Sequence, residues 1–230
     1  MTAAARDRLA LALDVGGPDD ADAVARRLAP WFGIAKVGLE LYAEAGPDIF
    51  DRMHTLGLAV FADLKLYDIP TTVERAARVL GRRGVQFLNF PAAGGEAMLE
   101  AGVTGLAEGA RDGGHPPPVA LAVTVLTSEA DVSEFDARLD AAASSGCGGV
   151  VCSAYEIATV KRRAPRLTTM VPGIRLPDEP HHDQARVATP ADAISRGADW
   201  LVVGRAVTAA NDPEAAADTI TREVAGALAR

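Results

Sequence analysis

Several residue types are scarce in this sequence of 230 residues, which has two cysteines, only three lysines and 5% aromatic residues. Cys147 and Cys152 lie in an apolar strand-like context without a histidine cluster nearby, so we expect two small buried thiols rather than a metal or redox pair. The run of roughly 20 apolar residues that a membrane span requires is also missing. Basic charge is low, and the net charge of −8 excludes a broad basic face for nucleic acid.

The amino-terminal stretch MTAAARDRLALALDV lacks the long apolar segment and the cleavage site of a secretory signal. Its Arg-Asp-Arg patch leads directly into a strand-like run, so we predict a cytoplasmic protein. Hydrophobic residues make up 49% of the chain, which is ordinary for a globular protein with a sizeable core. No low-complexity tail or second-domain pattern is present, and we predict a single domain over residues 1–230.

Eight short apolar or β-branched runs recur along the chain, separated by stretches with helical spacing. The runs are continuous rather than alternating, which favours parallel strands covered on both faces. We expect strands at residues 9–15, 34–41, 58–66, 85–90, 119–127, 148–153, 167–174 and 200–204. This pattern predicts an α/β fold, a (β/α)8 TIM barrel. A doubly wound open sheet is the alternative, although no G-x-G-x-x-G follows the first strand.

Charged residues interrupt the predicted strands near their carboxyl ends, where barrels of this type carry their chemistry. Asp14 ends the first run and Lys36 lies within the second. Asp63, Lys65 and Asp68 end the third run. Because neighbouring strands end at the same face of a barrel, these side chains are expected to form one alternating chain of acids and bases.

Strand alternation places Asp63 and Lys65 on one face of the third strand, with Leu64 and Leu66 directed toward the helices. Buried charges are costly, so one interpretation is an ion-pair plug inside the barrel. The other is a lysine kept protonated by carboxylates and able to give a proton to a substrate carbanion. The third lysine, Lys161, lies in the helical stretch TVKRRAP, where we expect a solvated surface charge.

A second polar group lies late in the chain, in three segments that follow or connect the last two strands: VPGIR (171–175), HDQARVATP (182–190) and VVGRAVT (202–208). Loops after strands seven and eight recurrently bind phosphate in such barrels. Gly204 allows close approach to an anion, Arg205 offers a bidentate fork, and Gln184 can donate from the connecting loop. Together they predict a phosphate site. His181 and His182 lack a third ligand at suitable spacing, so we predict no metal site.

The stretch DLKLYDIPTT (63–72) resembles the D-x-K-x-x-D-I-P-x-T signature of the orotidine 5'-phosphate decarboxylase family. Other segments resemble further family motifs in the same order and cover nearly the whole chain: LALDV, KVGLEL, VTVLTS, GVVCSAYE, VPGIR, DQARVATP and VVGRAVT. The Asp-Lys-Asp core is shared with related sugar-phosphate decarboxylases and synthases. The DIP-x-T extension and the nine-residue separation of Arg175 from Gln184 favour the orotidine branch.

The resemblance implies conversion of orotidine 5'-phosphate to UMP and CO₂, the last step of de novo pyrimidine nucleotide synthesis, without a metal or an organic cofactor. It implies that Lys65 protonates C6 as CO₂ leaves, with Asp63 next to the departing carboxylate and Asp68 helping to orient the ammonium. Lys36 and Asp14 are expected to hold ribose hydroxyls and to orient the charged network.

The resemblance also implies a homodimer in which Asp68, Ile69 and Thr72 reach the neighbouring subunit's active site. Thr127 is expected at the pyrimidine end of the substrate. The phosphate and lid side is expected to comprise Pro172, Arg175, Gln184, Gly204 and Arg205. One departure is the segment NFPAAGG, where Pro91 replaces the histidine of the N-V-H-A that bacterial relatives tend to have. We expect this change to affect the local loop more than the activity.

Three other functions stay open from the residues alone. A 3-keto-gulonate 6-phosphate decarboxylase or hexulose-phosphate synthase would need Mg²⁺ to hold an enediolate. A Schiff-base aldolase would also place a lysine at a strand end, but as a neutral amine, whereas the acids on both sides of Lys65 favour the ammonium. A non-catalytic nucleotide-phosphate-binding barrel would bind UMP without releasing CO₂.

Overall fold

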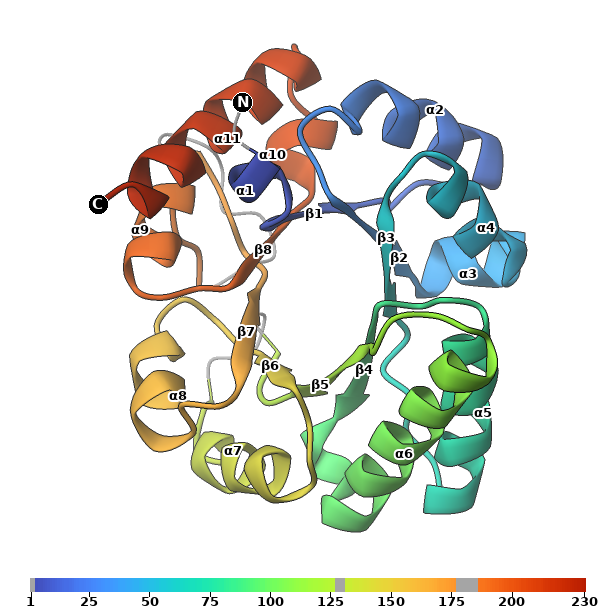
Figure 1. The fold of residues 1–230 in the computed structure, drawn as a ribbon. Helices are drawn as coiled ribbons and strands as arrows, with labels where there is room; N and C mark the ends of the chain where they lie inside the picture. Colours follow the sequence, from blue (N-terminus) through green and yellow to red (C-terminus); the bar gives the residue numbers. More distant parts are fainter. Residues whose placement is uncertain (1–2, 127–130, 177–185) are drawn as a thin grey trace.

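The computed structural model describes residues 3–126, 131–176 and 186–230 and shows a closed barrel of parallel strands surrounded by helices (Figure 1). Each strand pairs in parallel with its sequence neighbours, and β8 pairs with β1 to close the ring. The predicted (β/α)8 barrel is therefore confirmed, and the doubly wound open sheet is excluded.

All eight predicted strands are present, and each is shorter than predicted. Their bounds are β1 (Leu9–Ala12), β2 (Ile34–Gly38), β3 (Ala59–Asp63), β4 (Phe87–Pro91), β5 (Val119–Val123), β6 (Gly149–Val151), β7 (Thr168–Val171) and β8 (Trp200–Val203). The register places Lys36 of β2 opposite Ala12 of β1 and Phe61 of β3. Parallel pairing brings the carboxyl ends of all strands to one face of the barrel, which is where the charged residues follow.

The helices form the outer ring, and most of them follow a strand. Their bounds are α1 (Ala3–Arg6), α2 (Pro18–Leu28), α3 (Leu39–Ala45), α4 (Asp48–Thr55), α5 (Pro70–Arg82), η1 (Ala92–Gly94), α6 (Glu96–Asp112), α7 (Phe135–Ser144), α8 (Ile157–Arg163), α9 (Pro190–Ser195), α10 (Arg205–Thr208) and α11 (Pro213–Leu228). Proline occupies the first turn of α2, α5, α9 and α11, where its missing N–H costs nothing. None of the helices in the described ranges is long and apolar enough to cross a membrane.

Side chains that alternate along the strands separate the core into an inner and an outer part. The inner cluster fills the barrel: Ala10, Ala12, Ile34, Phe61, Phe87, Leu121, Met170 and Val202. Phe87 is central to it, because its ring lies edge-on to Phe61 and to Trp200, with centroid distances of 6.3 and 4.9 Å. The outer cluster lies between strands and helices and includes Cys147 and Cys152, which are buried thiols as predicted. Burial raises the pKa of both thiols.

Helices α5 and α6 pack backbone against backbone. A methyl group at Gly105 or Gly109 of α6 would overlap the carbonyl oxygen of Glu74 or Arg78 in α5, and one at Gly81 would overlap that of Leu106. The glycines therefore permit the close crossing of these two helices, and this crossing holds α5 next to the loop that follows β3.

Ion pairs and hydrogen bonds around Asp199 join the amino ends of β1, β7 and β8. Lys161 Nζ donates to Asp199 Oδ2 at 2.6 Å, and the same oxygen accepts from the Thr169 backbone N–H at 2.8 Å. Arg8 lies 3.7 Å from the other oxygen of Asp199. Lys161 lies in a helix and is partly exposed as expected, but its ammonium is also ion-paired with Asp199 at the amino end of β8.

Candidate active site

A pocket opens at the carboxyl ends of the strands, where the sequence placed its unusual charges. Its polar lining consists of Asp14, Lys36, Asp63, Lys65, Arg175 and Arg205. Its other lining residues are Ala12, Phe61, Val123, Val125, Leu126, Val151, Pro172, Gly173, Val202 and Gly204. Eight residues that the sequence predicted for the site, from five different strands, are thus brought together: Asp14, Lys36, Asp63, Lys65, Pro172, Arg175, Gly204 and Arg205.

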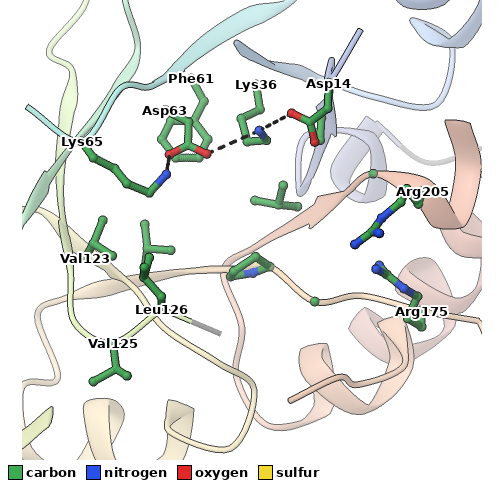
Figure 2. Close-up of a pocket in the computed structure, with 16 residues that line it drawn as sticks. Asp14, Lys36, Phe61, Asp63, Lys65, Val123, Val125, Leu126, Arg175 and Arg205 are labelled. Atoms are coloured by element: carbon green, nitrogen blue, oxygen red, sulfur yellow. Dashed lines mark hydrogen bonds and ion pairs between the residues drawn. The ribbon is translucent and has the colours of Figure 1, made fainter. Parts of the chain in front are cut away.

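Four charged side chains form a continuous chain across one wall of this pocket (Figure 2). Lys65 Nζ lies 2.5 Å from Asp63 Oδ1, and Lys36 Nζ lies 3.4 Å from Asp63 Oδ2. Lys36 Nζ also donates to Asp14 Oδ1 at 2.9 Å. The predicted alternation of acid and base across adjacent strands is confirmed.

Burial and charge act against each other in this chain of ions. Burial alone would lower the pKa of Lys36, but Asp63 and Asp14 outweigh it, so the pKa of Lys36 lies above its ordinary value. Burial alone would raise the pKa of Asp63, but Lys36, Lys65 and a hydrogen bond from Asn89 outweigh it, so this pKa lies below its ordinary value. Both side chains are therefore ionised at neutral pH.

From the sequence, we expect strand alternation to place Lys65 beside Asp63. The two side chains do meet, but not by strand alternation. β3 ends at Asp63, and Lys65 lies in the following turn with φ of 49°, the one non-glycine residue of the described ranges with positive φ. Such a backbone costs about 1 kcal/mol or more and persists only when the surroundings enforce it. Here Asn89 Oδ1 accepts from the Lys65 backbone N–H at 2.8 Å. The ammonium thus turns back toward the end of its own strand.

Asn89 is the site residue that sequence reasoning missed. It is fully buried in the middle of β4, and its Nδ2 donates to Asp63 Oδ1 at 2.7 Å while its Oδ1 accepts from the Lys65 backbone N–H. One amide therefore fixes both members of the Asp63–Lys65 pair. The available signal was an asparagine inside the apolar run VQFLNF, because a buried amide needs partners for all its polar atoms.

The Asp14 end of the pocket, away from Lys65, carries Arg175 and Arg205, whose guanidinium groups face the same space in Figure 2. Arg175 is only 7% exposed, and its Nη1 donates to the carbonyl oxygen of Ile174 at 2.8 Å. Arg205 is exposed and follows Gly204 at the end of β8. Two adjacent guanidinium forks provide a strong site for a phosphate or carboxylate anion.

Several predicted residues do not line the pocket of this chain. Asp68, Ile69 and Thr72 are exposed on the loop after β3 and the start of α5, and Asp68 Oδ1 accepts from the Ile69 N–H at 2.7 Å. Thr127 and Gln184 lie outside the described residues, as do His181 and His182. Pro91 ends β4 opposite Val123 and also lies outside the pocket lining.

The described residues contain no group of three or more His, Cys, Asp or Glu side chains that could hold a metal ion. The pocket combines a row of two ammonium groups and two carboxylates with a pair of guanidinium groups and an apolar wall that includes Val123, Val125 and Leu126. This arrangement can stabilise a carbanion, supply a proton to it, and bind an anion at a distance from the reacting atom.

Comparison with known proteins identifies relatives over almost the whole chain. Residues 7–220 match the family model described as "Orotidine 5'-phosphate decarboxylase / HUMPS family". The chain is 43% identical to the orotidine 5'-phosphate decarboxylase of Moorella thermoacetica, covering 96% of this chain and 93% of that protein. It is 45% identical to the enzyme of the same name from Nitratidesulfovibrio vulgaris, covering 94% and 97%.

Solved structures agree with these relatives. The barrel superposes on the orotidine 5'-phosphate decarboxylase of Lactobacillus acidophilus with a TM-score of 0.82 and 32% sequence identity, covering 95% of this chain and 99% of that one. The protein of the same name from Pyrococcus horikoshii gives a TM-score of 0.76 at 25% identity, covering 95% and 99%.

Proposed function

Because this chain belongs to the orotidine 5'-phosphate decarboxylase / HUMPS family, we infer that it converts orotidine 5'-phosphate to UMP and CO₂ in pyrimidine biosynthesis. The observation that carries this function is the unbroken row Lys65–Asp63–Lys36–Asp14, facing two arginines across one pocket. The relatives named above match over 93% and 97% of their length and carry the orotidine name.

We propose that Lys65 supplies both the electrostatic stabilisation and the proton. The bond between C6 and the carboxylate carbon breaks, CO₂ leaves, and the electron pair stays on C6. The Lys65 ammonium transfers a proton to C6, which gives UMP and a neutral amine that regains a proton from water. An ammonium fixed in place by Asp63 and Asn89 needs no reorganisation as the negative charge develops.

Asp63 is proposed to lie beside the departing carboxylate. It is held by three hydrogen-bonding or ionic partners, so it stays ionised in the pocket. Repulsion between two carboxylates raises the energy of the bound substrate and falls when neutral CO₂ forms. Lys36 and Asp14 are proposed to bind the ribose hydroxyls from the next two strands, while Lys36 also holds Asp63 in position.

The phosphate is proposed to bind between Arg175 and Arg205, beside Pro172 and Gly204, with Gln184 from the connecting loop. Thr127 is proposed at the pyrimidine end, next to the apolar wall that includes Val125 and Leu126. Because the phosphate is remote from the bond that breaks, its binding energy can be used to orient the base against Lys65.

We further propose a cytoplasmic homodimer in which Asp68, Ile69 and Thr72 complete the partner's site. Tyr67 and Ile69 expose 63% and 67% of their surface on the same short loop, and exposed apolar residues that adjoin polar ones are typical of interfaces. Asp68 on that loop would supply a second carboxylate near the partner's Lys65, as the sequence resemblance implies.

The test of this function is the loss of orotidine 5'-phosphate absorbance, followed with and without an excess of a metal chelator. We propose that no metal or organic cofactor takes part, so turnover should be unchanged by the chelator. Loss of activity on chelation would indicate the Mg²⁺-dependent branch of the family. Trapping of the substrate by borohydride would indicate a Schiff base, and UMP binding without CO₂ release would indicate a binding protein.

A further inference from the structure

Glu156 and Arg186 form an ion pair that is almost dry and that does not line the pocket. Their side chains expose 10% and 14% of their surface. Arg186 Nη1 also donates to Ser153 Oγ at 3.3 Å, and Glu156 Oε2 accepts from the Ser153 N–H at 2.8 Å. A buried ion pair often contributes no more stability than packed apolar side chains of similar size. The pair therefore needs an explanation besides stability.

Arg186 connects this ion pair to one wall of the pocket. Its Nη2 donates to the carbonyl oxygen of Leu126 at 2.9 Å, and Leu126 lines the pocket beyond the end of β5. The planar guanidinium thus joins the end of β5 to the turn after β6. A second link runs in parallel, because Thr124 Oγ1 donates to the carbonyl oxygen of Val151 at 3.1 Å.

The residues after Arg186 connect the same turn to the opposite wall. Tyr155 donates its hydroxyl to the carbonyl oxygen of Val187 at 3.3 Å. Ala188 then pairs with the segment after β7, because its N–H donates to Gly173 O at 3.1 Å and its carbonyl accepts from the Arg175 N–H at 3.0 Å. Gly173 and Arg175 line the anion end of the pocket.

We propose that Arg186 is a positioning residue that holds the apolar wall at Leu126 and the anion-binding wall at Arg175 at a fixed separation. The inference deepens the proposed function, because the ligand that needs this separation is a nucleotide with a base at one end and a phosphate at the other. Displacement of one wall by about 1 Å can lower the reaction rate by about 100-fold in a well-aligned site. Arg186 itself touches neither end of the ligand in this arrangement.

The test compares Arg186→Met with Arg163→Met, measuring the dissociation constant of UMP by calorimetry and the melting temperature. Arg163 also pairs two acidic residues between helices, but on the outside of the barrel. We expect Arg186→Met to weaken UMP binding by about 3- to 30-fold, with a melting temperature within a few degrees of the control. Arg186→Lys keeps the charge without the fork and should fall between wild type and Arg186→Met.

Either of two outcomes would overturn the inference. One is a folded Arg186→Met that binds UMP within twofold of wild type; the other is an equal loss in Arg163→Met. If Arg186→Met does not fold, Arg186→Lys provides the test. A fully retained affinity of Arg186→Lys for UMP would contradict the proposal that the guanidinium group of Arg186 is needed.

Hydrogen exchange gives a readout that needs no ligand. The amides of Arg175 and Ala188, which bond across the segment after β7, should exchange faster in Arg186→Met than in Arg163→Met. A wild-type protein that binds UMP but releases no CO₂ would refute the proposed function and leave this inference standing. Unchanged exchange together with unchanged UMP affinity would refute the inference and leave the function standing.

Discussion

Lys65 is placed where its charge matters because two neighbours fix it from different directions. Asp63 holds the ammonium, and Asn89 holds the backbone N–H in the left-handed conformation. An exposed lysine on a flexible loop would have to be ordered during the reaction, whereas this one is already aligned. The preorganised ammonium is the physical basis of the proposed decarboxylation.

Replacing Lys65 with alanine removes both the proton donor and the positive charge. We expect Lys65→Ala to lose at least about 10⁴-fold in kcat, because acid catalysis and electrostatic stabilisation are lost together. UMP binding should persist, since the two arginines are untouched. The measurements are turnover and UMP affinity, with Lys161→Ala as the matched control at the other end of the barrel. Near-wild-type turnover by Lys65→Ala would contradict the assignment.

The stability that Asp63 contributes should depend on pH with a defined sign. Its folded-state pKa is lowered, so the contribution is fully present above the unfolded pKa of about 4 and is lost as the pH falls through the folded value. We expect the free energy of unfolding of wild type to exceed that of Asp63→Asn by about 3 kcal/mol at pH 7, and the difference to shrink below about pH 4. The free energies of unfolding of the two proteins are measured by urea unfolding at pH 7 and at pH 3.

The exposed carboxylate of Asp140, which pairs with Arg163, provides the control for this pH series. Asp140→Asn should differ little from wild type at either pH, because surface ion pairs contribute little. A difference between wild type and Asp63→Asn that stays constant from pH 7 to pH 3 would show that the Asp63 ion pairs do not cause it. The stability that Lys36 contributes depends on pH in the opposite direction. Because the pKa of Lys36 is raised, its contribution is lost only at high pH.

Arg205 is predicted to act on the phosphate alone. Arg205→Ala should reduce kcat/KM for orotidine 5'-phosphate by about 10- to 100-fold, the value of a charge-assisted hydrogen bond. Orotidine without the phosphate has nothing for this side chain to bind, so its much slower turnover should change little. Parallel assays with the two substrates decide, and equal losses for both would count against a phosphate site here.

Sequence reasoning identified most of this site because charged residues at the ends of apolar strands are conspicuous. Four residues were predicted in this way and all line the pocket: Asp14, Lys36, Asp63 and Lys65. It could not foresee that Lys65 reaches Asp63 through a positive-φ turn, because that conformation depends on Asn89 from another strand. Which residue bonds to the Lys65 backbone is decided by the tertiary structure and cannot be read from the neighbouring sequence.

At the level of elements, the strands were predictable because continuous apolar runs leave few alternatives in a covered parallel sheet. The positions at which the strands end were not predictable, because apolar residues continue beyond the strands. Leu64 and Leu66, for example, follow β3 and pack against the outer core without belonging to the sheet. The close crossing of α5 and α6 was also not predicted. Its signal is the glycine spacing at 102, 105 and 109, which lowers helix propensity and therefore needs a packing reason.

Gly109→Ala should destabilise the barrel although alanine is the better helix former. A methyl group there would overlap the Arg78 carbonyl oxygen, and backbone cannot give way as a side chain can. We expect a loss of about 1–3 kcal/mol in the free energy of unfolding from overpacking. Gly226→Ala in α11 is the matched control, because nothing lies within 4 Å of its added methyl group and it should gain up to about 1 kcal/mol. Equal effects in both variants would refute the packing argument.

At the level of the whole molecule, the barrel divides its charges between two ends. Ion pairs around Asp199 join the amino ends of β1, β7 and β8, while the pocket occupies the carboxyl ends of the strands. The single chain also leaves the loop with Asp68 and Ile69 exposed beside its own pocket wall after β3. This exposure fits an active unit that is larger than one chain.

Mixing two inactive variants tests whether the active unit is a dimer with shared sites. In a heterodimer of Lys65→Ala and Asp68→Ala, one site carries both defects and the other carries neither if Asp68 acts across the interface. Random reassociation of equal amounts should therefore restore about one quarter of wild-type turnover, because half of the dimers are mixed and each has one intact site. Turnover is measured after unfolding and refolding the two variants together.

The result is decisive only when mixed dimers are known to form, so one variant carries a mass tag and the heterodimer is counted by native mass spectrometry. If Asp68 acted within its own subunit, each site of a mixed dimer would keep one defect, and turnover would stay at the level of the inactive parents. Recovery in proportion to the heterodimer fraction places Asp68 beside the partner subunit's Lys65, where a second carboxylate would keep the ammonium protonated until C6 accepts its proton.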